Sequence, residues 1–333
     1  MYTKQVPQTN LDEISRCEER RQMPDHGKSL SPFQKTDAVI KESINNALWK
    51  DDVLRALDYY EVDVFVKNGV VYLNGHIAGS TSQSRIENAM RAIPGILEIK
   101  NNLVLDNRLT IEVAGALGKL EHTSNCMFFT GVSHGVVVLH GEVGSVDVRL
   151  SAEQCAASNP RVRGVINSIR VPGTDLGTQE DYRLLQPPIG KKIYFLDGIS
   201  GIVRQVVIDP DNRRVVAMTI QGQFDKSRRN FTYSNFSGSR SAEQLLVIPN
   251  RVMGHVTKNS GFLTIQSTDS TNYQEFEASL FIAPNIDWQP PYPYCTDDVL
   301  FPVEHRSNQA SSTFKIEAQI MSEELLYNDS LGG

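Results

Sequence analysis

The sequence has no run of about 18 to 20 apolar residues, the length that a helix needs to cross a bilayer. Its first 21 residues are polar and charged, and they lack the apolar segment of a secretory signal peptide. We therefore expect a cytoplasmic protein, which can still lie at the periphery of a membrane.

Cysteine is scarce, since 333 residues contain four cysteines and no CxxC pair. This spacing argues against structural disulfides and against a zinc site. Cys126 and Cys155 lie among apolar residues, and we expect both to be buried free thiols.

Catalytic motifs are also absent. The chain has no P-loop, no GxGxxG, no GxSxG and no HExxH motif. His134 and His140 lie in one predicted hairpin, and His76 lies near the corresponding place earlier in the chain, but a metal would need further converging ligands. We therefore predict a protein that is not an enzyme, with no catalytic residue, no cofactor and no metal site.

The formal net charge of −6 argues against a dedicated nucleic-acid binder. The composition, 40% hydrophobic and 22% charged, is that of an ordinary globular protein with several cores. A length of 333 residues predicts two or three domains.

An internal repeat organises the first half of the chain. Residues 67–77, KNGVVYLNGHI, return as residues 133–143, SHGVVVLHGEV, at a spacing of 66 residues. From 66/132 to 105/171 the two copies align without a gap, so each copy is one supersecondary unit.

Each copy is predicted to read helix, strand, strand, helix, strand. In the first copy Asp37 is a candidate N-cap, and Ile40, Ile44 and Leu48 then follow with helical period. The alternating strand 62–66 leads into Asn68-Gly69, the dipeptide best suited to a two-residue hairpin turn. A second helix over about 80–92 ends at Pro94-Gly95, and a third strand covers 96–105.

On the strand–NG–VVYLNGHI hairpin, the helix after it and the IPGI…NNLVL strand, the chain resembles tandem BON domains, at 37–106 and 107–172. The resemblance implies small α/β sandwiches that act as phospholipid-associated or envelope-associated binding modules. It also implies that a monovalent cation is a candidate ligand, because some cytoplasmic members bind one.

After a Pro- and Gly-containing linker at 173–186, short strands with frequent turns predict a small closed all-β barrel. The segments IGKKIYFLDGISGIVRQVVIDPDNRRVVAMTI and LLVIPNRVMGHVTKNSGFLTI resemble a PRC-barrel domain, at 187–268. That resemblance implies a protein-docking module without catalysis. The expected fold class is thus α+β and multidomain, with two αββαβ sandwiches and one barrel.

The two ends of the chain differ from these domains. Residues 1–36 are predicted to be a flexible arm, and residues 269–333 an acidic extension rich in proline and aromatic residues. Residues 187–268 hold eleven basic and five acidic residues, whereas 269–333 hold two basic and eleven acidic residues. We therefore expect the extension to dock on the barrel, with Trp288, Tyr292 and Tyr294 as anchors in a polyproline-type segment on its surface.

One polar loop is a candidate binding site. It combines positive charge with aromatic residues, which suits lipid headgroups or RNA: Lys226, Arg228, Arg229 and Phe231. The alternative is a solvated loop. Turn geometry, rather than ligand chemistry, explains a further set of residues: Asn68, Gly69, Gly75, Gly135, Gly141, Asp197, Gly198, Asp209 and Pro210.

The sequence therefore predicts a binding or scaffold protein that docks to a protein complex or to an anionic membrane surface. Two alternatives stay open. One is a cytoplasmic sensor that binds a small ion or ligand through the BON repeats, and the other is a ribosome- or RNA-associated factor acting through the barrel. The oligomeric state does not follow from the sequence.

Overall fold

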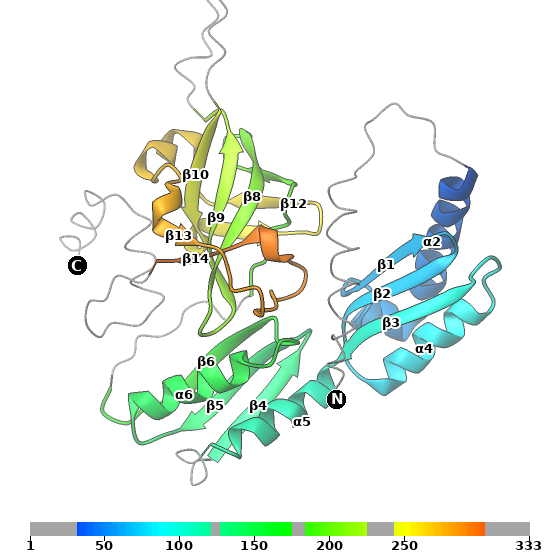
Figure 1. Cartoon of the computed structure of the whole chain (residues 1–333), viewed down its shortest axis with the longest axis horizontal. Coiled ribbons are helices and arrows are strands. Elements are labelled where there is room, and N and C mark those ends of the chain that lie inside the picture. The colour runs from blue at the N-terminus through cyan, green and yellow to red at the C-terminus, as the bar shows by residue number, and fades with distance from the viewer. Residues whose placement is uncertain (1–31, 121–126, 175–183, 225–242, 304–333) are drawn as a thin grey trace, which may run out of the picture. The chain divides into compact units, whose positions relative to one another are not determined.

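The computed structural model describes residues 32–120, 127–174, 184–224 and 243–303. By its contacts the chain divides into two units, residues 1–114 with 132–135, and residues 115–131 with 136–333. The described residues form two three-stranded sheets and one eight-stranded sheet, together with helices (Figure 1). The mixed α/β class predicted from the sequence is confirmed. None of the helices in these ranges is long and apolar enough to cross a membrane.

The first repeat has the predicted order of elements, with one added short helix. Its elements are α2 (Pro32–Lys50), α3 (Asp52–Leu57), β1 (Val62–Lys67), β2 (Val70–Ile77), α4 (Ser80–Arg91) and β3 (Glu98–Leu105). The hairpin strands β1 and β2 are antiparallel, and α4 is the crossover that makes β3 parallel to β2. Alternate residues of β1 and β2, among them Val64, Val71 and Leu73, face the helices and form the core with Ile44 of α2 and Ile86 of α4.

Gly75 of β2 allows a close backbone approach. Its φ is +123°, and a Cβ placed on it would lie 1.9 Å from the carbonyl oxygen of Glu61. Only glycine fits this position, because any side chain would collide with the main chain of the neighbouring strand.

The β1–β2 turn is held by a carboxylate. Asn68 and Gly69 have φ of +51° and +77°, as both central residues of a type I′ turn require. Their main-chain N–H groups donate to the carboxylate of Asp37, at 2.8 and 2.9 Å. The prediction that Asp37 caps a helix is wrong, because α2 begins at Pro32 and Asp37 lies inside it. We call a carboxylate that accepts from both central N–H groups of the hairpin turn a carboxylate clamp.

The second repeat has the same elements except α3. They are α5 (Asp106–Leu117), β4 (Met127–Ser133), β5 (Val136–Glu142), α6 (Val146–Ala157) and β6 (Gly164–Arg170). Its sheet has the order β4-β5-β6, and the parallel pair has the register of the first repeat, with Val137 opposite Val165 as Val71 is opposite Ile99.

The carboxylate clamp is repeated as well. Asp106, the first residue of α5, accepts hydrogen bonds from the main-chain N–H groups of His134 and Gly135, at 2.5 and 2.9 Å. Asp106 is buried, and its burial raises the pKa of the carboxyl group above the ordinary value, against the opposite effect of the two N–H donors.

The third sheet follows the linker. Its strands are β7 (Lys192–Tyr194), β8 (Ser200–Asp209), β9 (Arg214–Gly222), β10 (Gln244–Pro249), β11 (Met253–Val256), β12 (Ser260–Leu263), β13 (Phe281–Ile282) and β14 (Val299–Pro302). Short 3-10 helices cover Asn250–Val252, Ser267–Asn272, Ala278–Leu280 and Thr296–Asp298. The strand order is β10-β9-β8-β7-β12-β11. A closed barrel is not shown, since no pairing among the described strands joins β10 to β11.

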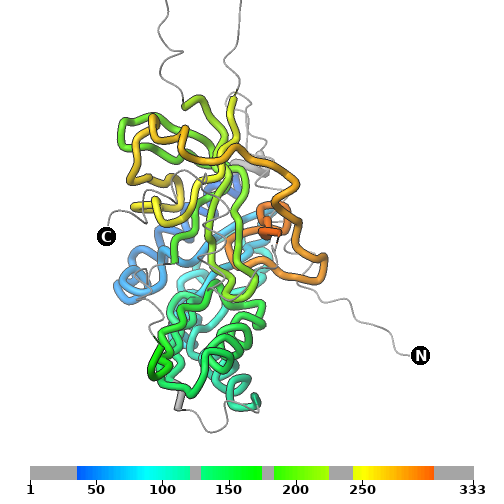
Figure 2. The backbone as a smooth tube through the Cα atoms, turned by 90° about the vertical axis from the view of Figure 1, so that its left-hand side faces the viewer, coloured from blue at the N-terminus to red at the C-terminus, as the bar shows by residue number. Residues whose placement is uncertain are grey.

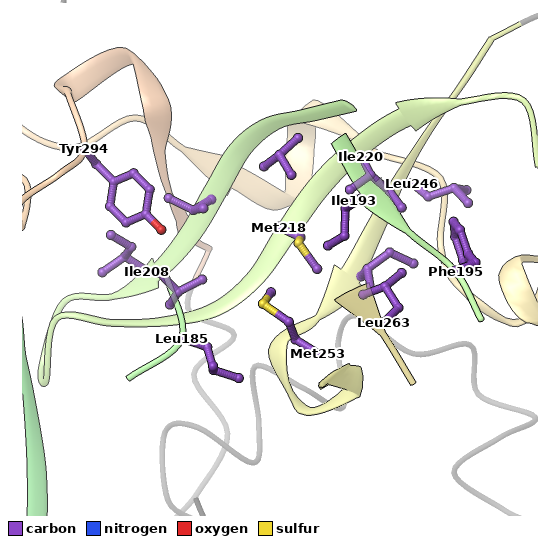
Figure 3. Close-up of a cluster of buried hydrophobic side chains, with 14 of the residues drawn as sticks. Leu185, Ile193, Phe195, Ile208, Met218, Ile220, Leu246, Met253, Leu263 and Tyr294 are labelled. Carbon is purple, nitrogen blue, oxygen red and sulfur yellow. The ribbon is translucent and has the colours of Figure 1, made fainter. Parts of the chain in front are cut away.

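The core of this sheet is drawn in Figure 3. Side chains from β7, β8, β9, β10 and β12 meet there, among them Ile193, Met218 and Leu263. A smaller cluster on the other side contains Val207, Ala217 and Val247. Strands β8 to β10 are therefore buried on both faces, which explains their nearly continuous apolar sequences.

The residues after 269 complete the sheet. Strand β14 pairs with β8, and Val299 lies opposite Val206. Tyr294 is fully buried in the core, and its hydroxyl donates to the carbonyl oxygen of Pro187 at 3.1 Å (Figure 3). The prediction of a segment lying on a surface is therefore wrong at Tyr294.

The cysteines also differ from prediction. Cys295 is disulfide-bonded, so the expectation of no structural disulfide is wrong. Cys155 is free and half-buried. Its partial burial raises the pKa of its thiol, which favours the neutral form.

Arg213 joins the eight-stranded sheet to the second repeat. It lies in the β8–β9 turn with φ of +61°, and only 3% of it is exposed. Its guanidinium donates to the carbonyl oxygens of Val162 (2.6 Å), Pro160 (3.2 Å) and Gln289 (2.8 Å). The main-chain N–H of Val165 donates to the carbonyl oxygen of Asn212 at 2.8 Å. Both views place this turn beside the second repeat (Figures 1 and 2).

The two carboxylate clamps predict unequal effects of mutation. Asp106→Ala leaves two N–H donors without an acceptor, and an unsatisfied buried donor costs about 1–3 kcal/mol. Asp37→Ala should cost less, because Asp37 is only half-buried and water can replace it. Calorimetric unfolding of both variants, with the exposed Asp52→Ala as control, tests this order. Equal transitions for Asp106→Ala and Asp52→Ala would contradict it.

The raised pKa of Asp106 adds a pH dependence. The stability gained from protonating this buried carboxyl group is fully present below its ordinary pKa of 3.8 and is lost as the pH rises through the raised folded value. The stability gap between the native protein and Asp106→Ala should therefore widen as the pH falls from neutral. If this difference in stability narrows on acidification, the predicted direction of the pH dependence is wrong.

Arg213→Met should weaken the contact between the eight-stranded sheet and the second repeat. The substitution keeps the apolar stem but removes three donated hydrogen bonds, and a bond from a charged donor contributes about 1.5–3 kcal/mol. Burial lowers the pKa of Arg213 to about 10, so relief of this desolvation offsets part of the loss. We expect a net loss of at least about 1.5 kcal/mol by calorimetry. Arg204→Met, at an exposed position on β8, is the control.

Candidate functional site

The four residues of the predicted binding loop, Lys226, Arg228, Arg229 and Phe231, lie outside the described residues. The three predicted anchors lie within them. Trp288 packs edge-to-face on Phe301 with ring centroids 4.8 Å apart, and the Arg213 guanidinium lies 5.0 Å from its ring centroid. The carbonyl oxygen of Tyr292 accepts from Gln186 at 2.9 Å. Trp288, Tyr292 and Tyr294 thus all contact other parts of the second unit.

The histidines do not converge on a metal site. His134 is the first central residue of the β4–β5 turn, His140 is exposed on β5, and His76 is buried on β2. Within the described ranges, no group of three or more His, Cys, Asp or Glu side chains is placed to hold a metal ion.

A cavity of about 620 Å³ lies within the second unit, where the end of α6, the β8–β9 turn and residues 287–289 meet. Arg213 lines this cavity, but its guanidinium already donates to three carbonyl groups. Asp211 and Asp287 supply the other charges.

An exposed aromatic and apolar surface on the first repeat is the better candidate. We call it the Trp49 patch, and it consists of Trp49, Val53, Leu57 and Tyr60. Their exposed fractions are 43%, 37%, 53% and 62%. Large apolar side chains grouped in this way on a folded surface commonly mark a binding site.

The end of α2 and the short helix α3 build the patch. Asp51 caps α3, and its side chain accepts from the N–H groups of Val53 and Leu54, at 3.0 and 3.1 Å. Hydrogen bonds from Leu54 and Val53, together with the charge of Arg85 at 2.9 Å, lower the pKa of Asp51, although desolvation opposes them. Leu54 is buried in the core, so Val53 and Leu57 are left pointing outward.

Ring contacts fix the aromatic part of the patch. Trp49 meets Tyr59 edge-to-face at 5.0 Å and Tyr60 at 6.4 Å, and the two tyrosines meet at 5.3 Å. The guanidinium of Arg55 lies 5.4 Å from the Trp49 ring centroid and donates to the Trp49 carbonyl at 3.2 Å. The rings are therefore preorganised, which reduces the entropy lost on binding.

The patch belongs to the first repeat alone. Leu48 and Leu117 are equivalent buried residues, and the residue after Leu117 is Gly118 where the first repeat has Trp49. The second repeat also has no helix equivalent to α3 within the described residues. The two repeats therefore present different surfaces.

Sequence reasoning did not find this patch. Periodicity over the six residues of α3 does not show which of its apolar side chains face the core. The available signal was a tryptophan and two adjacent tyrosines flanking a short helix with two outward positions, at 53 and 57.

The comparisons with known proteins agree with the repeat. The family model described as "BON domain" matches residues 36–107 and 131–173. No curated protein matches. No family match supports the PRC-barrel resemblance of residues 187–268, which stays a prediction.

Seven chains of solved structures match. One is CdsD, a structural protein of the type III secretion system of Chlamydia trachomatis, with 15% identity, a TM-score of 0.32, and coverage of 39% of this chain and 59% of that chain. Another is the C-terminal domain of CdsD, with 16% identity, a TM-score of 0.32, and coverage of 39% and 63%. This chain thus spans about three fifths of the chains that it matches. By its family match, the chain contains a BON domain, in two segments.

Proposed function

We propose that this chain is a non-enzymatic scaffold protein that docks on a phospholipid membrane surface, and that the Trp49 patch is the part that enters the membrane interface. A BON domain suggests binding to phospholipid or membrane surfaces. The observation that carries the proposal is the exposure of Trp49 and Tyr60 beside Val53 and Leu57 on a preorganised surface.

The chemistry of the patch suits the membrane interface. Tryptophan and tyrosine prefer the headgroup level, because one end of each side chain is apolar and the other is polar. Val53 and Leu57 add aliphatic surface that can reach the acyl boundary.

The patch supports weak and reversible binding. Burying one large apolar side chain completely contributes about 1.5–3 kcal/mol, so four that are roughly half exposed contribute about 3–6 kcal/mol. A dissociation constant of about 1 mM corresponds to about 4 kcal/mol. Stable attachment then requires several contacts at once, which the other modules of a scaffold supply.

Charges around the patch have both signs. Lys50 and Arg55 are exposed, and so is Asp52, which pairs with Arg55 at 2.6 Å. This mixture favours insertion of apolar side chains over attraction to anionic lipid. Binding should therefore change little with salt, unlike binding through a basic patch.

Vesicle sedimentation and tryptophan fluorescence test the proposal. In a Trp288→Phe background, the emission of Trp49 should shift to the blue when phosphatidylcholine vesicles are added, because the ring leaves water. Leu57→Ser and Tyr60→Ser should each weaken sedimentation with vesicles several-fold.

Val39→Ser is the matched control. Val39 is 62% exposed on the same helix, ten residues before Trp49 and thus about 15 Å away along the helix axis. It should bind vesicles like the native protein. The proposal is overturned if neither zwitterionic nor anionic vesicles bind at low salt, or if the control weakens binding as much as Leu57→Ser.

A further inference from the structure

The third strand of each repeat, β3 or β6, lies at the edge of its sheet, but the two edges have different surroundings. Strand β6 is an edge strand, and within the second unit the β8–β9 turn lies against it. The contact consists of the Val165 N–H donating to Asn212 and the Arg213 guanidinium donating to Val162 and Pro160. At this contact Val162 and Val165 are 0% and 1% exposed.

The equivalent surface of the first repeat is open. The alignment of the repeats places Ile96 at the position of Val162, Leu97 at that of Arg163 and Ile99 at that of Val165. Leu97 is 79% exposed and Ile99 is 36% exposed. We call residues 94–100 the β3 edge surface.

The main chain of the β3 edge surface has the geometry of its counterpart. Ile99 lies opposite Val71 just as Val165 lies opposite Val137, in parallel pairs of identical register. Since the Val165 N–H points away from β5 to reach Asn212, the Ile99 N–H points away from β2. The first repeat thus offers the same outward donor, together with the exposed side chains of Leu97 and Ile99.

We propose that the β3 edge surface binds a protein partner through a tight β-turn that presents a main-chain carbonyl group and an arginine, as the β8–β9 turn does for the second repeat. The chain itself supplies the template for this mode of binding. The site is separate from the Trp49 patch, and the proposal does not rest on membrane binding.

Charge supports an arginine on the partner. Glu98 of the first repeat is exposed, and it stands where the second repeat has the buried Gly164. A carboxylate at this place adds an acceptor next to the carbonyl groups that the guanidinium would reach. The two sites differ at this position, because a Cβ added at Gly164 would lie 2.7 Å from the side chain of Leu184.

The experiment supplies the partner turn at high local concentration. Residues 207–216, VIDPDNRRVV, are fused as an additional hairpin to the N-terminus of the full chain through a long Gly/Ser linker, which gives effective concentrations of about 1 mM or less. Amide hydrogen exchange at Ile99 is then measured by NMR. We expect this exchange to slow several-fold relative to the unfused chain.

Two references make the result decisive. The Val165 amide, already bonded to Asn212, should exchange slowly in every sample and report that the second repeat is intact. In a matched fusion, the appended arginine that copies Arg213 is replaced by glutamine, and the slowing at Ile99 should be lost. In the chain variant Glu98→Gln the slowing should be reduced, and in Val39→Ser it should persist.

Two outcomes overturn the proposal. One is unchanged exchange at Ile99 while Val165 stays protected, since this means that the turn does not bind. The other is equal slowing by the arginine and glutamine fusions, since this means that a non-specific contact protects the strand.

Discussion

A carboxylate that accepts the two N–H groups of a hairpin turn is the contact on which each repeat depends. Asp37 and Asp106 come from helices, whereas the turns come from strands about 30 residues later. Each clamp therefore fixes where the hairpin lies relative to the helix before it. Because both central residues of each turn have positive φ, their N–H groups point out of the hairpin and would otherwise need water. At Asp106 the clamp forms even though burial desolvates the carboxyl group, which is unfavourable for its charged form.

Much of each repeat could be predicted from the sequence, because the signals are local. The two glycine-containing turns, the alternation of β1 and the apolar period of Ile40, Ile44 and Leu48 act over a few residues. A spacing of 66 residues between the copies then extends each local prediction to the other copy. The BON resemblance rests on these same segments, and the family match confirms it over 36–107 and 131–173.

The remaining features depend on distant partners, which one sequence does not reveal. Asp37 has the local signature of a helix cap, but its partners are Asn68 and Gly69. Tyr294 lies among prolines and aromatic residues, and nothing near it in the sequence indicates a place in the core. For Arg213 the sequence shows only one more basic residue in a turn. The Trp49 patch was missed for a related reason, since the composition of α3 does not show which of its apolar side chains is buried.

The pairing of β14 with β8 has a consequence for how the protein is made. Domains generally fold from the N-terminus during synthesis, and both repeats consist of neighbouring segments that can pair early. The eight-stranded sheet cannot form early, because Val206 pairs with Val299 and the core includes Tyr294, and both partners are synthesised about 90 residues after β8. Until the last strand has left the ribosome, β8 keeps an open edge and the core lacks its largest fully buried side chain. A ribosome that stops before this point therefore releases a chain with folded repeats and an incomplete sheet, which is the form most exposed to proteases and to aggregation.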